Sequence, residues 1–144
     1  MIVSQILKSK ADIGVISVKA DASVLEAVGI LSEKRIGTVV VSEDGASLDG
    51  ILSERDIVRE MGKRGVACLA EPVSAIMTAK LVTCSPEDTA DKVLEMMTIG
   101  RFRHLPVMDN GAMVGLISIG DVVKARLSEL SMEKDALQGM IMGH

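Results

Sequence analysis

The chain has 144 residues, of which 48% are hydrophobic and 25% are charged, and its formal net charge is −4 at pH 7. This composition is typical of one globular domain or two small ones, with an interior built from aliphatic residues and ten Met. The acidic balance and the near absence of aromatic residues, a single Phe with no Trp or Tyr, argue against a nucleic-acid-binding protein.

The first elements follow from periodic apolar residues. They predict a short leading helix at 4–8, an apolar strand at 13–18 and a helix that begins after Ser23. Ser23 and Glu26 form a capping-box pattern just before the apolar face of this helix. The β-branched run at 38–41 is typical of a buried strand.

The next segments complete the first half of the chain. A turn is predicted at 43–45, a strand at 48–52 and a closing helix at 53–61. The connector at 62–77 contains Gly and Pro, and we expect a helical turn within it at 73–77.

The second half carries the same order of elements. The sequence predicts a strand that begins at Leu81, a helix with its apolar face at 90–97, a strand that starts near Pro106 and a turn at 109–111. A strand at 113–117 and a helix at 118–130 then close this half. The order strand, helix, strand, strand, helix therefore occurs twice.

This order reflects an internal repeat, in which residues 15–59 resemble residues 81–124. Gly45 pairs with Gly111, an offset of 66 (111 − 45). Because one copy spans several elements, the repeat implies two similar half-domains rather than a solenoid. A cleft between two related halves is a natural place for a ligand.

The repeat also suggests domain bounds. We expect a first repeat domain at 8–66, a second at 73–131 and a helical tail at 132–144. The apolar residues of the tail fall in a helical pattern from 128 to 142, so we expect the tail to extend the last helix and to pack at a subunit interface.

The most specific local motif is Ser-x-x-Asp at the start of each closing helix, formed by Ser53 with Asp56 and by Ser118 with Asp121. One interpretation is structural, because Ser and Asp at these positions cap a helix and complement its dipole. The other is a ribonucleotide site, in which the helix start binds phosphate and the Asp accepts hydrogen bonds from ribose hydroxyls. Both interpretations can hold together.

A basic run at 101–106 precedes the second copy's middle strand. Its residues Arg103 and His104 are candidates for a phosphate contact, although a solvated turn would look the same. Pro106 suggests a strand entry or an edge. Thr78 offers a hydroxyl before the second copy, or simply ends a helical turn.

No other cluster of residues points to catalysis or metal binding. Cys68 and Cys84 stand without a CxxC or Cys/His pattern, so we expect reduced thiols, with Cys84 on a strand, and no zinc site. His104 and His144 lie far apart, and His104 is the sole credible acid–base residue. With no leader and no run of about 18 apolar residues, we expect a cytoplasmic protein that does not contact a membrane.

Taken together, these motifs resemble a tandem pair of cystathionine-β-synthase (CBS) domains over about 13–126. The resemblance rests on the repeat, the Ser-x-x-Asp pair, Ile-Met-Thr at 76–78, Leu-Pro-Val at 105–107 and Asp-Asn-Gly at 109–111. The stretch at 87–123 is similar to small stand-alone bacterial CBS proteins that are labelled as related to inosine-monophosphate dehydrogenase, although the catalytic barrel of that enzyme is missing here.

The resemblance implies an α/β fold of the α+β kind, in which two βαββα repeats pack about a pseudo-twofold axis with two clefts. It also implies a disc-shaped homodimer and an adenosine ligand, such as AMP, ADP, ATP, S-adenosylmethionine or NAD. Ser118 and Asp121 would hold ribose and phosphate in one cleft, and Ser53 and Asp56 in the other. The remaining matched positions would line the base and backbone (Ile16, Gly37 and Thr38), reach phosphate (Arg55, Arg103 and His104) or offer a hydroxyl (Thr78).

The favoured function is therefore a nucleotide-sensing regulatory module, not an enzyme, with no catalytic cofactor. It would act on an unidentified protein partner or on its own assembly. The alternative is a structural dimerisation module without a physiological nucleotide. The copies differ at Arg55, which Gly120 replaces, and at Gly37 and Thr38, which Arg103 and His104 replace, so the two clefts should be unequal.

Overall fold

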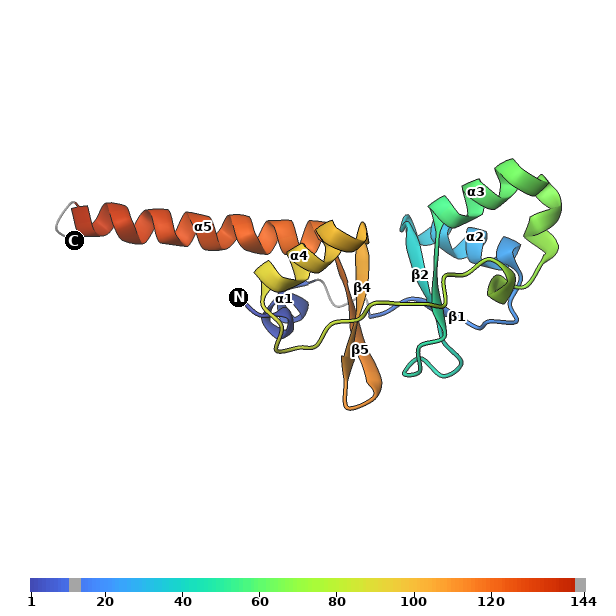
Figure 1. Cartoon of the computed structure of the whole chain (residues 1–144), viewed down its shortest axis with the longest axis horizontal. Helices are drawn as coiled ribbons and strands as arrows, with labels where there is room; N and C mark the ends of the chain where they lie inside the picture. The colour runs from blue at the N-terminus through green and yellow to red at the C-terminus, as the bar shows by residue number, and fades with distance from the viewer. Residues whose placement is uncertain (11–13, 142–144) are drawn as a thin grey trace. The chain divides into compact units, whose positions relative to one another are not determined.

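The computed structural model describes residues 1–10 and 14–141 and has mixed α/β architecture, as predicted. Ile13, Met142 and His144, which the sequence predictions included, lie outside the described residues. Figure 1 shows the elements along the chain. In chain order they are α1 (Val3–Ser9), β1 (Ser17–Val18), α2 (Val24–Lys34), β2 (Thr38–Val41), β3 (Gly50–Ser53), α3 (Glu54–Arg64), the 3₁₀ turns η1 (Val66–Ala70) and η2 (Val73–Ala75), α4 (Ala90–Gly100), β4 (His104–Asp109), β5 (Ala112–Ser118) and α5 (Ile119–Ile141).

The described residues form two compact units, each with its own core of buried side chains. Both cores are almost wholly aliphatic, as the shortage of aromatic residues predicted. We name the units by the repeat that each contains. The first-repeat unit comprises residues 14–82 and 110–114, and the second-repeat unit comprises residues 1–10, 83–109 and 115–141.

The first-repeat unit is built on a three-stranded sheet in the order β1-β2-β3. β1 runs parallel to β2, whereas β3 pairs antiparallel with β2, so that Thr38 lies opposite Ser53 and Val40 lies opposite Ile51. All residues of β2 are buried, which the β-branched run predicted. Because α3 follows β3 without a break, the register of the sheet fixes where that helix starts.

β1 is shorter than the strand predicted at 13–18. Only Ser17–Val18 form the strand, although the Ile16 carbonyl also accepts a hydrogen bond from the Val40 N–H at 3.0 Å. Gly14 has φ of 68°, in the left-handed region, and this backbone conformation interrupts the extended chain before Ile16.

β3 begins at Gly50, two residues later than predicted. The reason is the Asp44 side chain, whose Oδ1 accepts hydrogen bonds from the N–H groups of Ala46 at 2.9 Å and Ser47 at 2.7 Å. Asp in this role mimics a backbone turn. The predicted turn at 43–45 is therefore part of a longer loop.

The two helices that follow the first strands begin at hydroxyl caps. Ser23 Oγ accepts the N–H of Glu26 at 3.1 Å, and Thr89 Oγ1 accepts the N–H of Lys92 at 3.1 Å. The predicted apolar faces of these helices are buried in the two cores. The fully buried residues of these faces are Val24, Ala27 and Leu31 in α2, and Ala90, Val93 and Met97 in α4.

The connector between the repeats contains more helix than predicted. α3 runs past the expected end at 61 and stops before Gly65, whose φ of 75° cannot continue a helix. The turn expected at 73–77 forms as η2, and η1 precedes it without a clear signal in the sequence.

β4 and β5 form the hairpin predicted at the Asp-Asn-Gly sequence. Asn110 and Gly111 have φ of 52° and 79°, the values of a two-residue type I′ loop, between β4 and β5. β4 begins at His104, so Pro106 lies inside the strand and the predicted strand entry at Pro106 is wrong, whereas the alternative of an edge agrees with the two-stranded sheet of β4 and β5. Its carbonyl accepts the Cys84 N–H at 3.0 Å.

The strand predicted to begin at Leu81 is reduced to a single residue. Cys84 forms an isolated parallel bridge with Val107. The N–H groups of Val3 and Ser4 donate to the carbonyls of Asp88 at 2.8 Å and Pro86 at 2.9 Å, so the chain bonds to α1 from two residues after Cys84. These contacts leave only one residue of the segment paired with β4.

α1 packs in the second-repeat unit, although it precedes the first repeat in the sequence. Val3 and Ile6 are buried within the core formed by α4, β4, β5 and α5. The last helix of this unit in the sequence, α5, continues to Ile141, which confirms that the tail extends the last helix (Figure 1).

Neither cysteine is in a reactive setting. Cys68 and Cys84 are both buried free thiols, and burial together with the charge of Asp88 raises the pKa of Cys84 to about 11. Among the described residues, no group of three or more His, Cys, Asp or Glu side chains could hold a metal ion. None of the described helices combines the length and the apolarity that a bilayer crossing requires.

Gly50 provides a test of the packing that places Thr78 beside β3. A Cβ at Gly50 would lie 2.8 Å from both the Met77 sulfur and the Thr78 carbonyl oxygen. We expect Gly50→Ala to lower the free energy of unfolding by about 1–3 kcal/mol through overpacking, as measured by urea denaturation.

The matched control is Gly29→Ala in α2, where an added Cβ would meet nothing within 4 Å. Alanine favours a helix over glycine, so this variant should gain about 0.5–1 kcal/mol. Equal stability of the two variants would contradict the close approach of residues 77–78 to β3.

Candidate functional site

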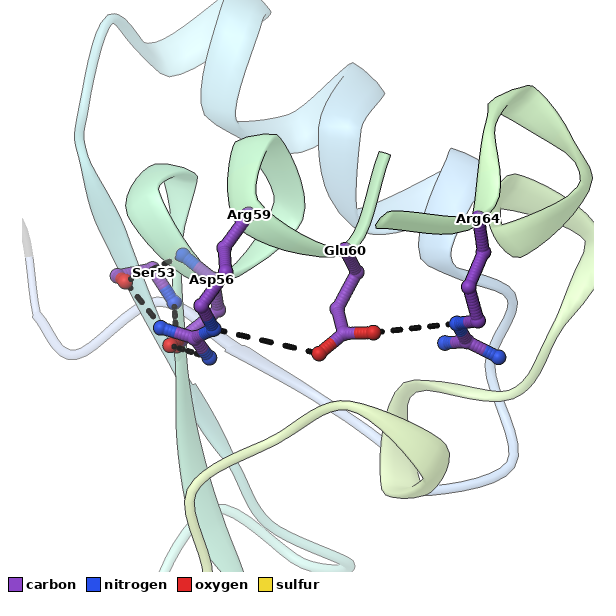
Figure 2. Close-up of polar contacts among 5 residues, drawn as sticks. All are labelled: Ser53, Asp56, Arg59, Glu60 and Arg64. Atoms are coloured by element: carbon purple, nitrogen blue, oxygen red, sulfur yellow. Dashed lines mark hydrogen bonds and ion pairs between the residues drawn. The ribbon is translucent and has the colours of Figure 1, made fainter. Parts of the chain in front are cut away.

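The Ser-x-x-Asp motif of the first repeat forms the junction between β3 and α3 (Figure 2). Asp56 Oδ2 accepts hydrogen bonds from the Ser53 N–H at 2.9 Å and the Ser53 hydroxyl at 3.0 Å. In return, Ser53 Oγ accepts the Asp56 N–H at 3.2 Å. This reciprocal arrangement is the capping box that the structural interpretation predicted. We call it the first-repeat junction.

Asp56 is also paired with a cation from its own helix. The Arg59 guanidinium donates to Asp56 Oδ1 at 2.9 Å, and the carboxylate side chain is only 10% exposed. The arrangement continues along α3 as a row of alternating charges, in which Glu60 lies 4.0 Å from Arg59 and 3.1 Å from Arg64 (Figure 2). Both oxygens of Asp56 therefore already accept hydrogen bonds from the protein.

The loop before β2 meets the same junction. The Gly37 carbonyl accepts the Glu54 N–H at 2.9 Å, and Thr38 pairs with Ser53 across the sheet. Two predicted residues, Gly37 and Thr38, thus lie directly beside Ser53 and Asp56. Of the first N–H groups of α3, those of Glu54 and Asp56 are already used by the protein.

The other predicted residues of the first repeat lie at different distances from the junction. Ile16 and Thr78 lie at opposite edges of the sheet, because the Ile16 carbonyl bonds to Val40 and Thr78 bridges to Ile51. Their partners Val40 and Ile51 pair with each other, and this pair lies two residues along the strands from the pair of Thr38 and Ser53, a distance of about 7 Å. Arg55, in the first turn of α3, is exposed.

The second-repeat junction, between β5 and α5, has the same backbone bonds. The Ser118 N–H donates to Asp121 Oδ2 at 2.9 Å, and Ser118 Oγ accepts the Asp121 N–H at 3.1 Å. The Arg103 carbonyl accepts the Ile119 N–H at 2.9 Å, the counterpart of the bond between Gly37 and Glu54. The structure thus builds one local geometry twice.

The cation at the second-repeat junction comes from another part of the chain. Lys10, the residue directly after α1, lies 2.8 Å from Asp121 Oδ2 and also donates to the Leu116 carbonyl at 2.9 Å. The side chain of Asp121 is 22% exposed. Burial raises its pKa, but the hydrogen bonds from Lys10 and from the Ser118 N–H outweigh this effect, so the pKa of Asp121 lies below its ordinary value.

His104 begins β4 near this junction and occupies the position that Thr38 has in the first repeat. Burial lowers the pKa of His104, and the charges of Lys10 and Arg103 lower it further, against the opposing charge of Asp121. The imidazole is therefore mostly neutral at pH 7. A neutral imidazole can hydrogen-bond to a phosphate through its N–H but adds no full charge.

Sequence reasoning missed the two cations that pair with the carboxylates. Arg59 had a detectable signal, because it follows Asp56 by three residues and lies on the same helical face. Lys10 had none, since only the packing of α1 in the second-repeat unit brings it to Asp121.

The comparisons with known proteins identify this architecture. A family model for the CBS domain matches residues 4–63 and 73–128. The chain belongs to the CBS domain family. Its two Ser-x-x-Asp junctions therefore stand at equivalent places in two CBS repeats, as the resemblance in the sequence implied.

Individual relatives agree with this assignment. A mitochondrial CBS domain-containing protein from Arabidopsis thaliana is 35% identical over 148 residues, which cover 98% of this chain and 72% of that protein. The crystal structure of a CBS-domain containing protein from Agrobacterium tumefaciens is 44% identical with a TM-score of 0.82, covering 88% of this chain and 99% of that chain. The crystal structure of another CBS protein, in complex with AMP, is 25% identical with a TM-score of 0.74, covering 88% and 96% of the two chains.

The pairing of Lys10 with Asp121 in the second CBS repeat can be tested by titration. In Lys10→Met the hydrogen bond that favours the ionised carboxylate is lost while the burial remains, so the pKa of Asp121 should rise. Carboxyl-carbon NMR across an acid titration measures this shift directly. The contribution of the pair to stability is present above the unfolded pKa of Asp and is lost as the pH falls through the lowered folded value.

Lys8→Met is the matched control, because Lys8 lies on the same helix and is exposed. It should leave the pKa of Asp121 unchanged. An Asp121 titration that is identical in wild type and Lys10→Met would show that the ion pair does not persist in solution.

Proposed function

We propose that this CBS protein is a regulatory module that binds an adenine nucleotide. The observation that carries the proposal is the duplicated junction, in which a hydroxyl, a carboxylate and a cation gather at a helix start in each repeat. A purely structural cap needs the hydroxyl and the carboxylate, but it needs neither a cation on that carboxylate nor a basic residue such as Arg103 nearby.

The chemistry of a nucleoside phosphate matches these groups. A carboxylate can accept hydrogen bonds from ribose hydroxyls, while a cation and a helix start can bind phosphate. At the second-repeat junction, Asp121 would accept ribose hydroxyls while Lys10, Arg103 and the His104 N–H reach phosphate. At the first-repeat junction, Asp56 and Ser53 would take the equivalent roles, with Arg55 at phosphate and Ile16, Gly37, Thr38 and Thr78 around the base and sugar.

The AMP complex of a CBS protein that is 25% identical supports an adenine ligand. AMP, ADP, ATP and NAD share the adenosine group that these residues would recognise, and they differ in the phosphate that Lys10 and Arg103 would meet. We favour the second-repeat junction as the first to bind, because Asp121 is more exposed than Asp56 and its cation comes from a separate element.

The proposed effect is a population shift rather than catalysis. A nucleotide changes the balance between two conformations by no more than its difference in affinity for them. That difference would be transmitted to a protein partner or to the assembly of a homodimer.

A panel of AMP, ADP, ATP, NAD and S-adenosylmethionine tests this proposal by thermal shift. A bound ligand at about 100 times its dissociation constant should stabilise the protein by about 2.7 kcal/mol. Asp121→Asn should remove most of this shift, because an amide cannot accept ribose hydroxyls as a carboxylate does, whereas Asp56→Asn should remove less. Each variant is compared with its own ligand-free melting temperature, and calorimetry gives the stoichiometry.

Asp109→Asn serves as the control, since Asp109 is exposed and lies at the end of β4 opposite to His104 and the second-repeat junction. It should respond to nucleotides as wild type does. If no nucleotide raises the melting temperature of wild type at millimolar concentration, the alternative of a structural dimerisation module is favoured. A full response in Asp121→Asn would overturn the assignment of the first site.

A further inference from the structure

The C-terminal half of α5 makes few contacts within its own unit. Val122 and Ala125 are the buried residues of this helix, and Figure 1 shows that it continues well past α4 and α1. From Leu130 to Ile141, every residue except Gly139 is exposed. Most helical stability in proteins comes from the packing of an apolar face, so a partner that covered this exposed segment would stabilise it.

The exposed apolar residues of α5 follow a heptad repeat. Positions 123, 127, 130, 134, 137 and 141 are separated by alternating steps of four and three residues. We call this line the α5 seam. Its members are Val123, Leu127, Leu130, Lys134, Leu137 and Ile141, and the apolar ones are 42–76% exposed.

We propose that the α5 seam pairs with the same seam of a second copy as an antiparallel coiled coil. An a/d heptad line is self-complementary, which a closed dimer requires of its interface. The pairing depends only on α5 and does not rest on the proposed nucleotide site.

Lys134 favours an antiparallel over a parallel orientation of the two α5 helices. It is the only charged residue among the six positions of the seam. In a parallel pair, Lys134 of both copies would occupy the same layer, where two like charges repel. In an antiparallel pair with Leu127 beside the partner subunit's Leu137, each Lys134 lies beside the partner subunit's Leu130. Glu133 borders the seam and provides an opposite charge within reach of the partner subunit's Lys134.

Sedimentation equilibrium of the full chain tests the interface. Wild type should associate more tightly than the double variant Leu130→Asp with Leu137→Asp, which keeps any contact made by the repeats themselves and loses only the α5 interface. These side chains are exposed within the single chain, so the variant should keep its circular dichroism spectrum apart from a loss of helix in α5. Met132→Asp is the matched control, because Met132 is 63% exposed on the same helix but lies outside the seam, and its association constant should equal that of wild type.

Disulfide crosslinking tests the orientation. Leu127→Cys and Leu137→Cys chains should crosslink when mixed and not when either is oxidised alone; the native Cys68 and Cys84 are buried and should not interfere. Crosslinking of Leu127→Cys with itself would overturn the antiparallel arrangement. A monomeric wild type, or equal association constants for wild type and the double Asp variant, would overturn the α5 interface.

Discussion

The junction between a strand and the helix that follows it is the constraint on which both repeats depend. A serine ends the strand and caps the helix, and an aspartate three residues later closes the reciprocal hydrogen bonds at 2.9–3.2 Å. These bonds satisfy backbone N–H groups that would otherwise lack partners where each sheet meets its closing helix. Because the strand register fixes the serine, it also fixes where the carboxylate lies.

The same junction holds its two carboxylates in different surroundings. Asp56 is bound by an arginine of its own helix, so this pair requires only that α3 is folded. Asp121 is bound by Lys10, which the packing of α1 brings to it, and the pair therefore depends on tertiary structure. A ligand that competes for the carboxylate would face a local pair in one repeat and a long-range pair in the other. This difference in origin is the physical basis for expecting unequal sites.

Sequence reasoning predicted what local patterns encode. The Ser-x-x-Asp caps, the buried run at 38–41 and the Asn110–Gly111 hairpin all depend on neighbouring residues, and all are present. The lengths of β1 and β3 were wrong, because Gly14 and Asp44 impose backbone geometry that a hydrophobic pattern does not report. The contact of Lys10 with Asp121 could not be predicted, since it joins residues 111 apart (121 − 10) through the packing of α1.

The placement of α1 has a consequence for the order in which the protein folds during synthesis. Val3 and Ile6 belong to a core whose other members lie between Cys84 and Ala125. The first-repeat unit draws nearly all of its residues from 14–82, so its core is complete while the ribosome is still translating the second repeat. α1 is the first helix to leave the ribosome, and its apolar face therefore stays exposed to solvent until most of the chain has been synthesised. Nascent chains in that interval are the ones that a chaperone would bind.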